Sequence, residues 1–149
     1  TGWGGSSRRR QPLAATGVPD LARRVRLLAG LNPGLAGTVS DRGFLPERLL
    51  EWLEALEQLA PNTPVAEVFD ALSGEFPEEA IEFERDARVD AGGLRGLSQA
   101  EAAAEMTDAL DRMRQKGVEA EIRRLVEAGI RSDEERNAYH RLMALQKRA

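Results

Sequence analysis

Apolar residues recur every three or four positions from about residue 19 to about residue 147, and prolines and glycines divide this pattern into segments. Signals for strands are almost absent: aromatic residues make up only 5% of the chain, runs of β-branched residues are missing, and no Asn-Gly or Asp-Gly hairpin turn occurs. Because this spacing places apolar side chains on one face of a helix, the sequence predicts an all-α fold.

Prolines begin most of the expected helices in the first two thirds of the chain, and prolines or glycines end them. Thr63 is the expected N-cap of the fourth helix, with Pro64 as its first helical residue. Glycines after residue 91 predict a flexible connection behind the fifth helix. The five expected helices cover about 19–31, 33–39, 46–59, 64–73 and 77–89.

Helical spacing also predicts which residues these segments bury. The third segment carries a leucine stripe that includes Trp52, while its glutamates should face water. In the fifth segment, we expect Ala80, Ile81, Phe83 and Ala87 to face inward. Val89, at the end of the segment, is a further candidate for this face.

The last third of the chain contains two sequence signals for helix starts. Ser98 and Glu101 form a capping box, and the helix that follows should run about 30 residues, or about 45 Å, to Ala128. Gly117 is interpreted as a joint where this helix passes from one packed body to another. Gly129 should end the helix with positive φ.

Ser132 and Glu135 form the second capping box, and the final helix should reach about Lys147. It should bury either Ala138, Leu142 and Leu145 or Tyr139 and Leu142, depending on its rotation. We therefore expect a flexible basic linker (1–18), a helical bundle (19–117), and an antiparallel helical hairpin (118–149) that follows the long helix.

Composition excludes most kinds of chemistry. The chain has no cysteine and one histidine, His140, so thiolate zinc sites, disulfides and sites with two imidazoles are impossible. No nucleotide-binding glycine motif or calcium loop is present. The acidic groups Glu78/Glu79/Glu82 and Glu134/Glu135 are interpreted as solvated helix faces and caps. We expect a non-catalytic cytoplasmic protein without cofactor or metal.

Charge is unevenly distributed, although the net charge is only −4. Residues 1–40 carry a net charge of +5, including the run Arg8–Arg10, and the remaining residues carry −9. Such an acidic remainder repels polyanions, so little direct binding of nucleic acid is expected. A nucleic-acid-binding module that uses the N-terminal arginines is kept as an alternative, as is a generic helical adaptor.

Several segments, taken in order, resemble the C-terminal helicase-binding domain of the DnaG-type bacterial DNA primases. The similarity covers about residues 20–149, and the order and spacing of its motifs carry it. The segments are Arg23–Val39 with Leu-Asn-Pro-Gly-Leu-Ala, Ala109–Met113, Glu119–Leu125, and Gly129–Arg136, which resembles the family's Gly-Leu-Ser-x-Glu-Glu-Arg signature.

This resemblance implies an interaction domain whose hairpin docks on the N-terminal domain of the hexameric replicative helicase and recruits the primase to the replication fork. The parent protein would be the enzyme, a primase, and this chain would not be catalytic. The residues expected at the helicase contact combine apolar anchors with charges: Ile122, Arg123, Arg124, Leu125, Val126, Ile130, Arg131, Glu134, Glu135, Arg136, Tyr139, Leu142 and Arg148.

The resemblance also implies a second partner. Some relatives bind the acidic C-terminal tail of the single-stranded DNA-binding protein through a basic patch on the first helix. Arg23 matches an arginine of that patch, and Arg24 and Arg26 lie nearby. Leu21, Ala22 and Gln99 do not match other members of the patch.

Overall fold

The computed structural model describes residues 17–148, apart from the side chains of residues 91, 92 and 148, and every regular element in this range is helical. The all-α prediction is therefore confirmed. Residues 1–16, with most of the predicted linker and Arg8–Arg10, lie outside the described range. The elements are α2 (Val18–Leu31), η2 (Pro33–Thr38), α3 (Glu47–Glu57), α4 (Val65–Leu72), α5 (Pro77–Val89), η3 (Ala91–Gly96), α6 (Gln99–Ala128) and α7 (Asp133–Arg148).

Most helix ends fall within two residues of the predicted ones, but two local predictions were wrong. Thr63 is not an N-cap: its hydroxyl donates to the carbonyl of Ala60 at 2.7 Å, and Pro64 is extended rather than helical. The short helix predicted for the segment 33–39 is confirmed, as a 3-10 helix over 33–38. The glycine-rich connection is also a 3-10 helix, η3, because Leu94 packs into the interior and holds it.

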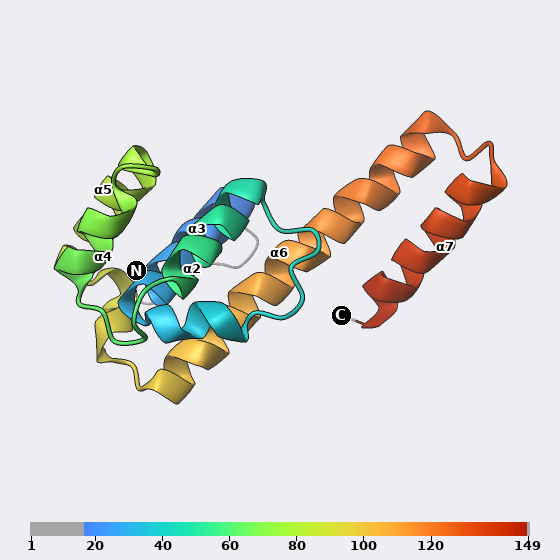
Figure 1. Ribbon diagram of the computed structural model, residues 1–149. Helices are drawn as coiled ribbons and strands as arrows, with labels where there is room; N and C mark the ends of the chain where they lie inside the picture. Colours follow the sequence, from blue (N-terminus) through green and yellow to red (C-terminus); the bar gives the residue numbers. More distant parts are fainter. Residues whose placement is uncertain (1–16, 149) are drawn as a thin grey trace, which may run out of the picture.

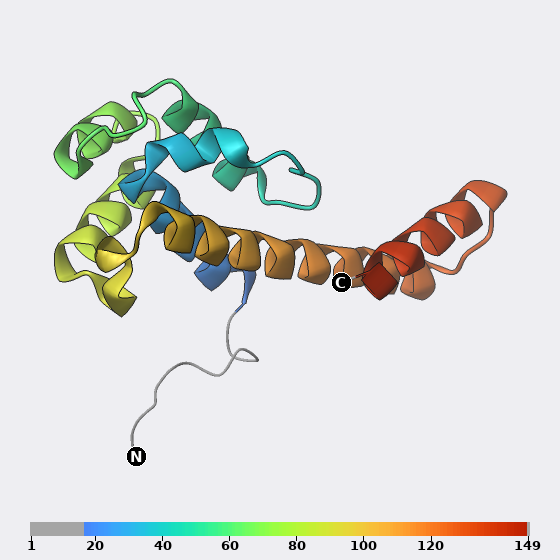
Figure 2. The ribbon, with the colours of Figure 1, turned by 90° about the horizontal axis from the view of Figure 1, so that it is seen from below.

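One core, here called the bundle core, joins α2–α5 to the first half of α6 (Figures 1 and 2). Trp52 is fully buried in it and packs in T-shaped contact with Phe76 and Phe83, at centroid distances of 5.4 and 5.8 Å. The leucine stripe predicted for the third helix is the face of α3 that supplies this core. The last buried residue of the bundle core along the chain is Met113.

The inward face of α5 differs from the predicted one. Ile81 and Val89 are 51% and 64% exposed, so their prediction as core residues was wrong. The buried face instead runs through Ala80, Phe83 and Ala87, and it continues upstream to Phe76 just before the helix. Ile81 is one residue, or 100°, away from Ala80 around the helix, which turns it toward water. The same face contains the buried carboxylate of Asp86, which periodicity did not predict.

A second, smaller core lies beyond the bundle and is here called the hairpin core. It consists of buried Val118, Leu125 and Leu142, with partly buried Ile122, Ala138 and Tyr139 packed against them. These residues come from the second half of α6 and from α7, which lie antiparallel (Figure 1). The predicted boundary at 117/118 falls in the gap between the two cores, and the division into domains stays a prediction.

A close contact between α6 and a loop explains why residue 117 is a glycine, and the sequence did not indicate this contact. A Cβ on Gly117 would lie 2.8 Å from the Cβ of Phe44, so a larger residue here would collide with the loop before α3 (residues 39–46). α6 itself runs through Gly117 as one continuous helix of 30 residues. Among helices of residues 17–148, none is long and apolar enough to cross a membrane.

Candidate protein-docking surface

Hydrogen bonds at both ends of the connection between α6 and α7 fix the hairpin turn. Gly129 ends α6 with φ of +83°, as predicted. The amide of Glu135 donates to the Ser132 hydroxyl at 3.0 Å, and the Ser132 amide donates to the Glu135 carboxylate at 3.1 Å. The predicted capping box is confirmed. The amide of Arg131 also donates to that carboxylate, and these backbone donors lower the pKa of Glu135.

Several predicted contact residues instead hold the hairpin together. Leu125 and Leu142 are buried in the hairpin core, and Ile122 and Tyr139 are partly buried there. Two alternative buried faces were predicted for α7, and residues of both pack inward: Ala138 and Tyr139 partly, and Leu142 fully. Leu145 is 37% exposed. These residues can shape a docking surface, but most of their area is already used inside the hairpin.

The other predicted contact residues lie on the outside of the hairpin. Val126 is 54% exposed, although it follows the buried Leu125 directly in the sequence. Arg123, Arg131 and Glu134 are exposed, while Ile130 and Glu135 are half-buried at the turn. Arg124 pairs with Glu121, and Arg136 pairs with Asp133 at 3.0 Å. The Arg148 side chain lies outside the described residues.

An open groove of about 550 Å³ lies between the hairpin and the loop before α3. Its apolar lining includes Leu125 and Leu142 from the hairpin core, Leu145 from α7, and Phe44 from the loop. The guanidinium-bearing side chains of Arg124 and Arg141 also line it. Phe44 and Arg141 were not predicted as site residues, because neither a loop aromatic nor a single surface arginine has a periodic signal.

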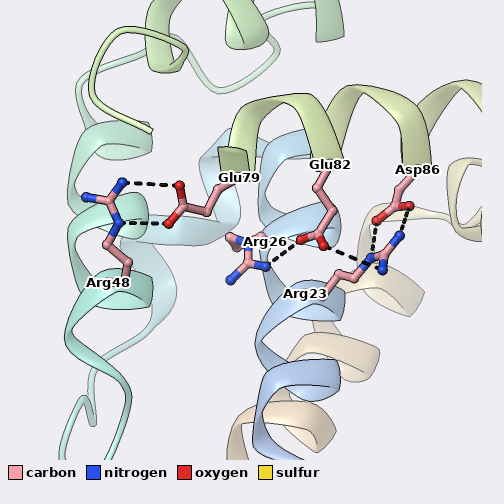
Figure 3. Close-up of polar contacts among 6 residues, drawn as sticks. All are labelled: Arg23, Arg26, Arg48, Glu79, Glu82 and Asp86. Carbon is pink, nitrogen blue, oxygen red and sulfur yellow. Dashed lines mark hydrogen bonds and ion pairs between the residues drawn. The ribbon is translucent and has the colours of Figure 1, made fainter. Parts of the chain in front are cut away.

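The three arginines predicted to bind an acidic tail are all engaged within the chain, and Figure 3 shows two of them, Arg23 and Arg26. Arg23 donates to both carboxylate oxygens of Asp86, at 2.6 and 2.7 Å. Arg26 pairs with Glu82 at 2.6 Å, and Arg24 pairs with Glu105. A tail would have to compete with these carboxylates, and its binding stays a prediction.

These pairs also correct the interpretation of the acids on α5. Glu79 and Glu82 are not part of a solvated face: their side chains are 18% and 31% exposed, and each accepts from an arginine of another helix (Figure 3). Arg48 of α3 binds Glu79 at 2.7 Å, and its guanidinium lies 4.5 Å from the centroid of the Phe76 ring. In the described residues, no group of three or more His, Asp or Glu side chains could hold a metal ion.

Arg23→Ala should lower the free energy of unfolding by about 1–3 kcal/mol, because it leaves the buried Asp86 carboxylate without its bidentate partner. Arg24→Ala is the matched control, since both members of the Arg24–Glu105 pair are more than 40% exposed, and it should cost less than about 0.5 kcal/mol. Urea unfolding followed by circular dichroism measures both. Equal effects of the two substitutions would contradict the structural role of Asp86.

Glu79→Gln should reduce stability at neutral pH and make little difference in acid. The hydrogen bond from Arg48 lowers the pKa of Glu79 below its ordinary value of 4.5, so the ion pair stabilises the fold above that value and is lost as the pH falls through the lowered one. Unfolding curves at neutral and acidic pH measure this. Glu78→Gln, on an exposed neighbour, is the control; a pH-independent loss in Glu79→Gln would contradict the expectation.

Comparison with protein-family models, with curated proteins and with solved structures finds no match to this chain.

Proposed function

We propose that this chain is a non-catalytic protein-interaction domain of a bacterial DNA primase, which binds the N-terminal domain of the replicative helicase in the cytoplasm and brings the primase to the replication fork. One observation carries the proposal. The second half of α6 and α7 form a hairpin with its own core beyond the bundle (Figure 2), and Val126 stays exposed on it.

The physical basis is the usual division of roles at a helix-mediated interface. Exposed apolar residues such as Val126 supply the desolvated contact, and the surrounding charges, Arg123, Arg131 and Glu134, set orientation and association rate. The primase resemblance supports the choice of helicase as the partner, because the Gly129–Arg136 motif lies at the hairpin turn, where the structure has its cap.

The direct test mixes the full chain with a hexameric bacterial replicative helicase and measures the mass of the eluted species by size exclusion with light scattering. A species heavier than the hexamer is expected. If the chain and the helicase elute separately at concentrations well above the Kd expected of a specific complex, the proposal is refuted. A generic helical adaptor is then favoured.

A matched pair of substitutions locates the contact. Val126→Asp should weaken the complex at least about tenfold, because it places a charge where an apolar side chain would be desolvated. Val89→Asp introduces the same change at an exposed position of α5 and should leave binding unchanged. Equal affinities of the two variants would contradict contact through this face.

A further inference from the structure

The loop before α3 carries an aromatic residue in an unfavourable conformation. Phe44 has φ of +66°, in the left-handed region that bulky residues rarely adopt. Asparagine or glycine would adopt it at lower cost, so folding alone does not explain a phenylalanine here. Its side chain is nevertheless 44% exposed, so burial recovers only part of the cost.

The surrounding structure holds this loop in place. Arg114 of α6 donates from Nε to the Asp41 carbonyl at 3.0 Å, and Arg42 donates to the carbonyls of Val39 and Ala36 at 3.0 and 2.9 Å. Gly117 provides the space in which Phe44 approaches α6. The loop thus lies beside the middle of α6 (Figures 1 and 2). The Phe44 side chain that it carries is partly exposed.

That ring forms one wall of the groove described above. The apolar lining from the hairpin includes Leu125, Leu142 and the half-exposed Leu145. Strained residues that persist in a fixed loop are typical of binding sites. A groove of about 550 Å³ with apolar walls can take a few side chains of a partner.

Charge at the groove indicates which partner fits. Arg124 is balanced by Glu121, another lining residue, whereas Arg141 forms no ion pair within the described part of the chain. The lining therefore has one surplus positive charge beside an apolar floor. A carboxylate on the partner would pair with Arg141, and a cationic side chain would be repelled.

We propose that this groove binds a short amphipathic helix of a partner protein, with apolar anchors on one face and carboxylates next to them. Helices dock in apolar grooves through residues spaced three and four apart. The inference deepens the proposed function and rests on it, because the same hairpin carries both. It adds Phe44 and Arg141 to the docking surface and states the chemistry of the partner segment.

The test uses the full chain and two labelled synthetic peptides of about 16 residues, long enough to form a helix when bound. Both carry leucines at helical spacing; one carries glutamates at the flanking positions and the other lysines. Fluorescence anisotropy should show at least about tenfold tighter binding of the glutamate peptide. Equal binding of both peptides, or no saturable binding of the glutamate peptide, would overturn the proposal.

Variants of the chain locate the binding. Phe44→Asn and Arg141→Glu should each weaken binding of the glutamate peptide about tenfold. Ile81→Asn and Arg88→Glu, at exposed positions of α5, are the matched controls and should bind as the parent does. Unchanged affinity in both groove variants would overturn the assignment of the site.

A stability measurement separates docking from folding. Because asparagine tolerates positive φ better than phenylalanine, Phe44→Asn should keep or raise the melting temperature while it weakens binding. A large drop in melting temperature would mean that Phe44 supports the fold and would count against the proposal.

The same variants, mixed with the helicase N-terminal domain, distinguish this inference from the proposed function. A helicase complex that forms and is unaffected by Phe44→Asn, with no peptide bound, overturns the groove and leaves the function standing. Peptide binding that depends on Phe44 and Arg141, without any helicase complex, supports the groove and refutes the helicase assignment.

Discussion

Deleting residues 118–149 should abolish binding to the helicase N-terminal domain and leave a folded helical remainder. The deletion removes every buried residue of the hairpin core and none of the bundle core, whose last buried residue is Met113. The shortened chain retains the contact between Phe44 and Gly117 and the hydrogen bonds from Arg114 to the loop. The remainder should therefore fold while it lacks the docking surface.

Calorimetric titration of the shortened and full chains into the helicase N-terminal domain measures this effect. Circular dichroism with a cooperative thermal transition is the control that the remainder is folded. Unchanged affinity of the shortened chain would place the contact on the bundle and would refute the proposed role of the hairpin.

Trp52→Ala should lower the free energy of unfolding by about 3–5 kcal/mol, a large part of the 5–15 kcal/mol typical of a domain. Trp52 is fully buried, and its ring packs in T-shaped contact with Phe76 and Phe83, which come from a different part of the chain. Truncation leaves a cavity where α3 meets α5, and the surrounding helices can close it only in part. Urea unfolding followed by circular dichroism measures the loss.

Trp52→Phe is a milder substitution at the same position, for comparison with Trp52→Ala. It keeps an aromatic ring against Phe76 and Phe83, and it removes the indole N–H, which is buried without a hydrogen-bond partner among the described residues. Its cost should therefore be less than half that of Trp52→Ala. Ile81→Ala, at a position 51% exposed, is the surface control; an effect of Trp52→Ala no larger than this control would contradict a central role for Trp52.

The sequence was informative where a structure depends on neighbours in the chain. The Ser98–Glu101 and Ser132–Glu135 capping boxes and the positive φ of Gly129 were all predicted, because each involves residues within four positions of one another. Thr63 failed as a predicted N-cap because a competing local bond, to Ala60, takes its hydroxyl.

The candidate docking surface could be predicted only in part. The primase resemblance and the hairpin pattern pointed to residues 118–149, but periodicity could not tell Leu125, which is buried in the hairpin core, from Val126, which is exposed. That difference depends on the rotation of α6 against α7. The groove beside the hairpin could not be predicted at all, because Phe44 reaches it from a loop more than 70 residues before Leu125 in the sequence.

The sequence alone predicted a helical chain, most of its helix ends and a closing pair of helices joined by a short turn, because capping, proline and glycine effects act over a single turn. Two contacts follow only from the packing of the helices in three dimensions: Arg23 pairs with Asp86, and Gly30 lies against the Phe83 ring, where a Cβ would approach to 2.3 Å. These contacts join residues more than 50 positions apart, and they exist only because packing of the bundle core brings α2 against α5.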